Sequence, residues 1–393
     1  IRTFGFYKRL ESLLVIATLG LYIFYINYKT DAKYNANRSL KPRSELGEWI
    51  SSITFAIIAA TLVHTYFMQP FTIPTSSLEK SLLVGDYLFV SKFHYGARVP
   101  STVIAAPMVH DTLPLIGKSF LSDDKEETYQ TSWKNKFSLP YLRLPGFQKI
   151  KNNDIVCFNW PADSLATMWG DTSGKFTYKP VDKKTNYVKR CVGIAGDSLE
   201  MKDGYFYING KKNELPYRAK LQFYYTFECK EPISQSTYPK FLLDKERTGV
   251  YRILTEYWED QRVQEAIKEN GSLTKIGQDS LYTEVAGGLN PQLAQRLKME
   301  SVENKININM TDEEVERLKK YPLTASVTKI TYEADKAIFP HVESLNWSQD
   351  NFGPIYIPEA GATVQLDLAS LPFYEQIIKN YEHNDLVVNG SDI

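Results

Sequence analysis

Two residues of this chain could together attack an acyl group: a serine, Ser77, and a lysine, Lys189. A serine hydroxyl is a poor nucleophile at neutral pH and needs a base within hydrogen-bond reach. A lysine amine can act as that base only when it is uncharged, and at its ordinary pKa roughly one lysine in a thousand is uncharged at pH 7.4. Burial lowers the pKa of a lysine because loss of water disfavours the charged form. Val188, Val192 and Ile194 lie close to Lys189 in the sequence and predict such burial.

Two uncharged runs precede Ser77. The run 49–68 has about the 20 residues that a helix needs to cross roughly 30 Å of hydrocarbon, and the run 12–28 is shorter but ends in residues suited to a membrane interface. We expect two transmembrane helices, about 12–28 and 49–68, within residues 1–70, although a buried helix of a soluble core is the alternative for each. The loop 29–48 is basic, so the positive-inside rule predicts that it is cytoplasmic and that the chain after it emerges on the other side. Its basic residues are Lys29, Lys33, Arg38, Lys41 and Arg43.

After the second uncharged run, the pattern of residue types along the chain changes twice. Residues 71–210 contain short apolar strands and a hairpin with an Asp-Gly turn, which predicts the first part of a β domain. Residues 211–340 are charged and have helical periodicity, with a capping box at Thr311, and we expect an inserted helix-rich subdomain there. Residues 341–393 should return to the β domain, and the final segment looks cut inside a hairpin. The expected fold is membrane-anchored and mainly β, with antiparallel sheets and a helical insertion.

The composition argues against several classes of protein. Lysine plus arginine equals aspartate plus glutamate, 46 each, so no basic excess points to nucleic acid. The three cysteines, Cys157, Cys191 and Cys229, are too few for a disulfide framework. The sequence has no metal-ligand spacing and no phosphate-binding glycine loop. We therefore expect no metal, no cofactor and no nucleic-acid partner.

The order of the motifs resembles the type I signal peptidases, the bacterial leader peptidases. That family has a Pro-Ser-Gly-Ser-Met segment after its second membrane span, and residues 74–78 occupy that place, so Ser77 matches the nucleophile. The family's Tyr-x-Lys-Arg-x-x-Gly-x-x-Gly-Asp box is matched by residues 187–197, so Lys189 matches the general base. The family strand Gly-Asp-Ile-Val-x-Phe is matched by residues 153–158, with Asn in place of Gly.

The resemblance is close over residues 49–98 and 150–210 and hardly touches the insertion. It implies a serine endopeptidase that cleaves N-terminal signal peptides from exported preproteins through an acyl-enzyme on Ser77. It also implies an oxyanion hole made by the Thr75 hydroxyl and the Ser77 backbone N–H. By matched position, the pockets for small substrate side chains are lined by Phe71, Ile73, Leu78, Leu82, Leu88, Val156, Tyr187 and Val188.

The family also implies a location and partners. Its members lie in the bacterial inner, or cytoplasmic, membrane, and we expect this chain to be multi-pass with its catalytic domain on the periplasmic side. The expected partners are preprotein signal peptides and the lipid bilayer.

Three departures from the family pattern stand out. Leu78 replaces the usual Met, and Glu79-Lys80 replaces a hydrophobic-proline pair, which puts charge beside the nucleophile. The Gly-Asp-Asn-Arg-like box of the family is missing, and residues 350–354 are only a faint echo of it. We expect that box downstream of Ile393.

Other interpretations stay open at this point. Ser77 and Lys80 form an S-x-x-K pattern like that of penicillin-binding proteins and β-lactamases, in which the two residues lie one helical turn apart. A membrane-tethered β domain without catalytic activity is a second alternative. A Ser-His-Asp triad would need one of four histidines, none of which lies in a recognisable motif: His94, His110, His341 and His383.

Overall fold

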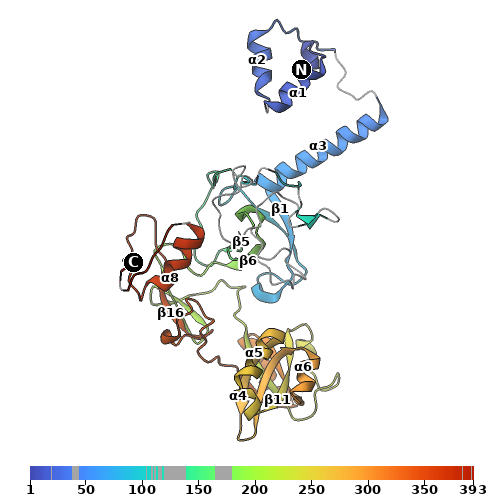
Figure 1. Ribbon diagram of the computed structural model, residues 1–393. Helices are drawn as coiled ribbons and strands as arrows, with labels where there is room; N and C mark the ends of the chain where they lie inside the picture. Colours follow the sequence, from blue (N-terminus) through green and yellow to red (C-terminus); the bar gives the residue numbers. More distant parts are fainter. Residues whose placement is uncertain are drawn as a thin grey trace. The chain divides into compact units, whose positions relative to one another are not determined.

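The structure is a computed structural model of the 393-residue chain (Figure 1). It divides into two compact units, Ile1–Thr65 and Tyr66–Ile393, which are considered separately. The described residues are all except 19, 38–43, 103, 108, 110–111, 114–116, 119–138, 164–178, 383 and 391. Residues outside the described part include the basic Arg38, Lys41 and Arg43 and the histidines His110 and His383.

The first unit contains short helices where one span was expected. The run 12–28 is divided between α1 (Arg9–Ala17) and α2 (Leu21–Lys29). Each has nine residues and so rises only about 14 Å, half the thickness of a bilayer core. Gly20 between them has a φ of 92°, and the Thr18 hydroxyl donates to the α1 carbonyl of Leu14 and accepts from an α2 amide. Two N-terminal transmembrane helices are therefore not confirmed. A 3-10 turn, η1 (Arg2–Phe4), precedes α1.

The second expected span is present as a continuous helix. Helix α3 (Glu45–Tyr66) has 22 residues, and within the described ranges it is the one helix long and apolar enough to cross a membrane. None of its most apolar stretch is buried against protein. It begins earlier than the expected residue 49 because the Ser44 hydroxyl accepts a hydrogen bond from the Gly47 amide at its N-terminus. It ends before the expected residue 68 because Met68 already belongs to a strand.

The β domain predicted for the second unit is built from several small antiparallel sheets. The antiparallel character predicted from sequence is confirmed. Asp203 and Gly204 both have positive φ, 51° and 82°, as the predicted two-residue hairpin turn requires. The pairs are β1 (Met68–Thr72) with β2 (Tyr87–Ser91), β3 (Thr112–Leu113) with β4 (Gly117–Lys118), and β5 (Ile155–Asn159) with β6 (Asn186–Arg190). The four-stranded sheet has the order β16 (Phe352–Tyr356), β7 (Ser198–Lys202), β8 (Tyr205–Ile208), β9 (Lys211–Lys212).

Residues 211–340 were expected to be rich in helix, and they contain a six-stranded sheet as well as helices. Six antiparallel strands have the order β12-β13-β11-β14-β10-β15. Their bounds are β10 (Phe223–Cys229), β11 (Arg247–Leu254), β12 (Gly271–Gln278), β13 (Tyr282–Leu289), β14 (Glu300–Met310) and β15 (Thr324–Lys329). Strand β10 shows why they were missed: buried Tyr225, Phe227 and Cys229 alternate with partly exposed residues, and this two-residue period is hidden by the surrounding charge.

The helices expected in this segment are present beside the sheet. The capping box at Thr311 opens α7, and the Asn290 side chain caps α6. Residues 255–270 form two helices that meet at Asp260, whose side chain caps the second one. Their bounds are α4 (Thr255–Glu259), α5 (Gln261–Asn270), α6 (Pro291–Arg296) and α7 (Asp312–Lys319). We call residues 213–340, which follow β9, the inserted subdomain.

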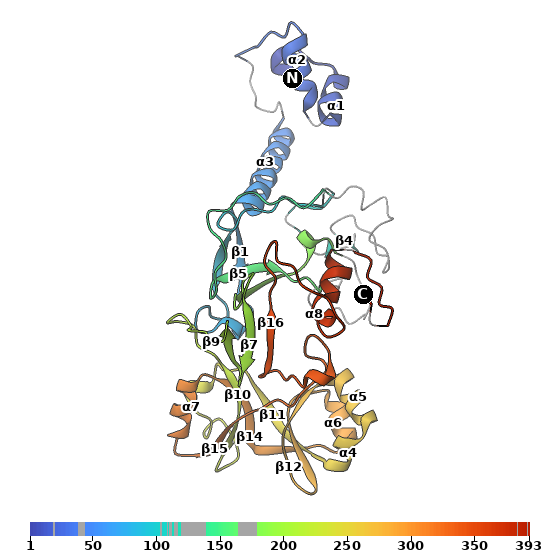
Figure 2. The same cartoon turned by 90° about the vertical axis from the view of Figure 1, so that its left-hand side faces the viewer.

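The inserted subdomain has two apolar cores along its sheet. Figure 2 shows α7 at one end of the sheet and α4, α5 and α6 at the other. Under α7 the core includes Phe227, Ile308 and Leu318, all fully buried. Under α5 and α6 it includes Ile253 and Val285. Burial of these side chains is what fixes the sheet and helices to one another.

The chain after the inserted subdomain returns to the four-stranded sheet. Strand β16 pairs antiparallel with β7, so residues far apart in sequence lie side by side. The Asn351 side chain accepts from the backbone of Asp203 at the β7–β8 turn, which places the 350–354 segment at that hairpin. The remaining short elements of the second unit are η2 (Ser76–Leu78), η4 (Val181–Lys183), η5 (Lys240–Leu242), η6 (Glu343–Leu345), α8 (Leu371–Gln376) and a π-helical turn, η7 (Ile377–Tyr381).

Candidate active site

Ser77 lies in the middle of the 3-10 turn η2, in the loop that joins β1 to β2. We call residues 73–86 the Ser77 loop. Its base is closed by two backbone hydrogen bonds between Ile73 and the opposite end of the loop, at Gly85 and Asp86. Ile73 and Leu78 are buried at 5% and 8% exposure, and these apolar anchors leave Ser77 itself exposed. The local sequence therefore holds the hydroxyl at the surface on a fixed turn.

Lys189 reaches this hydroxyl from a different sheet. It lies in β6, paired opposite Val156 of β5. Its Nζ is 2.6 Å from the Oγ of Ser77, although 112 residues separate the two in sequence. This is hydrogen-bond distance, so the proton of the hydroxyl could pass directly to a neutral amine.

The surroundings of Lys189 favour that neutral amine. Burial lowers the pKa of Lys189 from its ordinary value of 10.5, because partial removal of water destabilises the ammonium. The side chain is half-buried. A lysine of this kind can be deprotonated near neutral pH more often than one in water, which is what a general base requires.

Arg190 follows Lys189 in β6, and strand alternation assigns it to the other face of the strand. Its guanidinium donates to the Asn153 carbonyl and to the Ser81 hydroxyl, each at 2.7 Å. Burial also lowers the pKa of Arg190 from its ordinary value. Because Ser81 belongs to the Ser77 loop, the strand that carries Lys189 also holds that loop. Sequence reasoning missed this contact, since nothing in the motif indicates the partner of Arg190.

The eight residues expected to line the substrate pockets come from three segments around the pair. Phe71 and Leu88 are cross-strand partners in β1 and β2. Ile73, Leu78 and Leu82 belong to the Ser77 loop.

Strand register separates the three that remain. Val156 and Tyr187 share the Lys189 face of the β5–β6 pair, whereas Val188 pairs with Cys157 on the other face. Of the eight residues, Ile73 and Leu78 are buried and the other six are partly exposed.

Thr75 immediately precedes the 3-10 turn. It is exposed and extended, with φ of −134° and ψ of 156°, and its side chain makes no capping hydrogen bond to the turn. Within the described ranges, no group of three or more His, Cys, Asp and Glu side chains is arranged to hold a metal ion.

Two alternative assignments lose support from the geometry. Lys80 directs its Nζ to Glu314 at 3.1 Å, so the lysine of the S-x-x-K pattern has a carboxylate partner. The ring of His94 bonds to the Ser91 hydroxyl and stacks on a phenylalanine. His341 contacts the Lys336 carbonyl. Neither histidine is engaged with Ser77.

The chain is similar to known proteins of one family. A family model described as signal peptidase, peptidase S26, matches residues 46–248, more than half of the chain. The chain belongs to the peptidase S26 family. The matched residues include both Ser77 and Lys189, whereas β12 to β15 of the inserted subdomain lie outside them. The predicted resemblance to type I signal peptidases is confirmed.

Curated proteins of the same family are similar over part of their length. Signal peptidase I of Rickettsia massiliae (strain Mtu5) is 27% identical over 184 residues, which are 47% of this chain and 48% of that protein. Signal peptidase I of Rickettsia rickettsii (strain Sheila Smith) is 28% identical over the same length and shares. Signal peptidase I of Rickettsia typhi (strain ATCC VR-144 / Wilmington) is 25% identical over 174 residues, 44% of this chain and 47% of that protein. The chain spans about half the length of the curated relatives it matches.

Proposed function

We propose that this protein is a signal peptidase I, which cleaves N-terminal signal peptides from preproteins. The observation that carries the proposal is the 2.6 Å separation of Lys189 Nζ and Ser77 Oγ, together with burial that lowers the pKa of the lysine. A serine with an activated lysine at hydrogen-bond distance is a nucleophile–base pair. Membership of the peptidase S26 family supports peptide-bond hydrolysis as its reaction.

In the proposed first step, neutral Lys189 takes the proton of Ser77 as Oγ attacks the scissile carbonyl carbon. The carbonyl oxygen becomes an oxyanion, and we propose that it accepts hydrogen bonds from the Ser77 backbone N–H and the Thr75 hydroxyl. Loss of one such donor typically raises the barrier by about 3 kcal/mol. The intermediate collapses when the C–N bond breaks and the Lys189 ammonium gives its proton to the leaving amine. The acyl group is then bound to Ser77 as an ester.

In the second step, Lys189 takes a proton from water, and the hydroxide attacks the ester. The C–O bond to Ser77 breaks, the serine recovers its proton from the lysine, and the carboxylic acid that leaves loses its remaining proton to solvent. No cofactor enters either step. The residues expected to select small substrate side chains are Phe71, Ile73, Leu78, Leu82, Leu88, Val156 and Tyr187, with Val188 on the opposite strand face.

We further propose a site of action at the bacterial inner membrane. Helix α3 would span the bilayer, and the basic residues before it would keep its N-terminal end in the cytoplasm, so the catalytic residues would lie on the outer side. A second span over 12–28 would need α1 and α2 to join through Gly20. A bilayer favours such joining, because unpaired backbone groups have no water there.

The experiment that tests the activity is cleavage of a preprotein by the purified protein in detergent. Wild type is compared with Ser77→Ala, and Ser76→Ala is the matched control because it removes a neighbouring hydroxyl from the same turn. Wild type and Ser76→Ala should release a signal peptide cut after a small residue, and Ser77→Ala should release none. Absence of cleavage by the wild type would favour a non-catalytic membrane-tethered domain, and cleavage by Ser77→Ala would exclude Ser77 as the nucleophile.

A further inference from the structure

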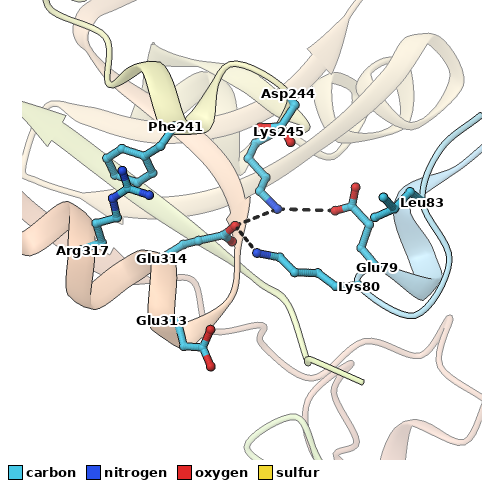
Figure 3. Close-up of a pocket in the computed structure, with 9 residues that line it drawn as sticks. All are labelled: Glu79, Lys80, Leu83, Phe241, Asp244, Lys245, Glu313, Glu314 and Arg317. Carbon is cyan, nitrogen blue, oxygen red and sulfur yellow. Dashed lines mark hydrogen bonds and ion pairs between the residues drawn. The ribbon is translucent and has the colours of Figure 1, made fainter. Parts of the chain in front are cut away.

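The two residues that depart most from the family pattern, Glu79 and Lys80, contact the inserted subdomain (Figure 3). The Glu79 carboxylate lies 3.4 Å from the Nζ of Lys245. The Lys80 ammonium lies 3.1 Å from the carboxylate of Glu314, and Lys245 lies 3.0 Å from the same oxygen. Four charges of alternating sign therefore link the Ser77 loop to the inserted subdomain. We call Glu79, Lys245 and Glu314 the ion-pair network.

The three residues of the ion-pair network are well shielded from water. Their side chains are 5% exposed at Lys245, 11% at Glu314 and 13% at Glu79, whereas Lys80 is 45% exposed. Burial opposes the charge of Lys245, but hydrogen bonds and charge from Glu314 and Glu79 outweigh it and raise its pKa. Loss of one member would leave its partners charged and poorly solvated, which is far more costly than loss of a surface pair.

Glu314 is a rigid anchor because each of its carboxylate oxygens has a separate task. One oxygen accepts hydrogen bonds from the backbone and hydroxyl of Thr311, which completes the capping box of α7. The other oxygen binds Lys245 and Lys80. The carboxylate thus cannot follow the loop without breaking the cap of its own helix. Burial opposes ionisation of Glu314, but the Thr311 and lysine contacts outweigh it and lower the pKa.

The inserted subdomain makes a further contact to the same loop residue. The Gln222 side-chain amide lies 3.5 Å from the Glu79 carbonyl and 3.4 Å from its carboxylate. The Glu79 backbone amide donates to the Ser76 carbonyl at 3.0 Å, so Glu79 is bonded to the turn that contains Ser77. A displacement of Glu79 would therefore be transmitted through Ser76 to the turn that carries Ser77.

We propose that the ion-pair network positions Ser77 against Lys189, which makes the inserted subdomain part of the catalytic architecture. Arg190 holds Ser81 from the strand of the base, and the network holds Glu79 from the inserted subdomain. The loop is fixed from both directions. Glu79, Lys245 and Glu314 are positioning residues, because none of them contacts the reacting atoms. This inference rests on the proposed function.

The first test is Lys245→Met, with Lys305→Met as the matched control. Lys305 pairs with Glu284 at 2.9 Å in the same subdomain. In Lys305→Met, Glu284 still has Arg252 as a cationic partner, just as Glu314 still has Lys80 in Lys245→Met. A displacement of about 1 Å at a reacting group can lower a rate on the order of 100-fold, so kcat of Lys245→Met should fall by ~10- to 100-fold with KM nearly unchanged. The control should retain its kcat. Equal kcat values for the two variants, or a loss confined to KM, would overturn the proposal.

A double-mutant cycle shows whether the two sides act as one unit. Glu79→Gln alone should lower kcat as Lys245→Met does, and the double variant should be little worse than either single variant, because residues in one network are not additive. Additive losses of kcat would mean that Glu79 and Lys245 act separately, and would refute the proposal that they position Ser77 as one network. Glu79→Gln also leaves the core of the inserted subdomain unchanged, so it remains informative if Lys245→Met fails to fold.

Hydrogen exchange tests whether the ion-pair network holds the Ser77 loop, and this measurement does not depend on enzymatic activity. In Lys245→Met the amides of residues 78–85 should exchange faster than in wild type, whereas those of β10 and β14 should keep their protection. In Lys305→Met the loop should exchange as in wild type. An unchanged loop in Lys245→Met would refute the positioning role. If the wild type cleaved no preprotein, the proposed function would fail while this measurement still decided whether the network holds the loop.

Discussion

Replacement of Lys189 by arginine should abolish cleavage, although a positive charge and several N–H donors remain beside Ser77. The reason is the supply of neutral base. An ordinary arginine has a higher pKa than an ordinary lysine and is neutral roughly 100-fold less often at pH 7.4, when roughly one lysine in a thousand is neutral. Burial lowers the pKa of Lys189 further, so the difference between the two side chains exceeds about 100-fold. This is within the 10²- to 10⁴-fold that a general base typically contributes.

The assay is the pH dependence of kcat/KM for preprotein cleavage. In the wild type the rate should rise with pH as Lys189 loses its proton, and the midpoint should lie below the ordinary value of 10.5, because burial lowers this pKa. Lys189→Arg should stay at background across the same range. A midpoint at or above 10.5, or an arginine variant with more than about a tenth of the wild-type rate, would refute the general-base role.

Loss of the Lys189 amine should lower activity without lowering stability. A lysine whose pKa is lowered on folding binds fewer protons in the folded than in the unfolded state between its two pKa values, so stability should rise with pH through that window. Below the folded-state pKa, the free-energy cost of burying the charged Lys189 amine is present in full. Lys189→Met removes it, and the variant should unfold at the same or a higher temperature than wild type at pH 7. A markedly lower unfolding temperature would show that Lys189 is structural.

Three further changes have defined outcomes. Lys80→Met should lower kcat by no more than about fivefold, since a pair with a lysine this exposed typically contributes about 0–1 kcal/mol; a loss as large as that of the base itself would revive the S-x-x-K mechanism. Thr311→Ala should reduce the free energy of unfolding by about 1 kcal/mol in a denaturant titration, because it removes the cap of α7, and no change would mean that the cap is dispensable. Gly353→Ala should lower the free energy of unfolding by about 1–3 kcal/mol or more, because φ at this residue is +98° and an added Cβ would lie 2.7 Å from the Leu199 carbonyl oxygen. Gly361→Ala, with similar φ but open space around it, should be less destabilising in the same titration.

The reacting pair could be predicted from sequence because its motifs are local. A serine after an apolar run and a lysine inside a strand each have a recognisable neighbourhood, and their order along the chain resembles that of the type I signal peptidases, which favoured Lys189 over Lys80. Strand alternation assigns Arg190 and Lys189 to opposite faces of β6, and in the structure Arg190 has partners of its own, Asn153 and Ser81. What no local pattern contained was the 2.6 Å approach of Ser77 to Lys189, which depends on how two separate sheets pack.

The inserted subdomain shows where local patterns fail. The capping box at Thr311 revealed its helix, because a cap acts within four residues of chain. The strands were hidden, because a strand such as β14 is stabilised by partners distant in sequence and leaves charged residues on its open face. Similarly, the break at Gly20 depends on a backbone angle that apolar composition does not reveal.

By itself, the sequence determined the chemistry available to this protein: a hydroxyl that can act as a nucleophile, an amine that burial can neutralise, and two apolar runs, of which 49–68 is long enough for a bilayer. Only the tertiary structure decided which lysine meets the serine, since Lys80 is three residues away and yet binds Glu314, whereas Lys189 arrives from another strand. The physical reason is that residue type sets what a group can do, whereas packing between distant segments sets which groups meet and how much water surrounds them.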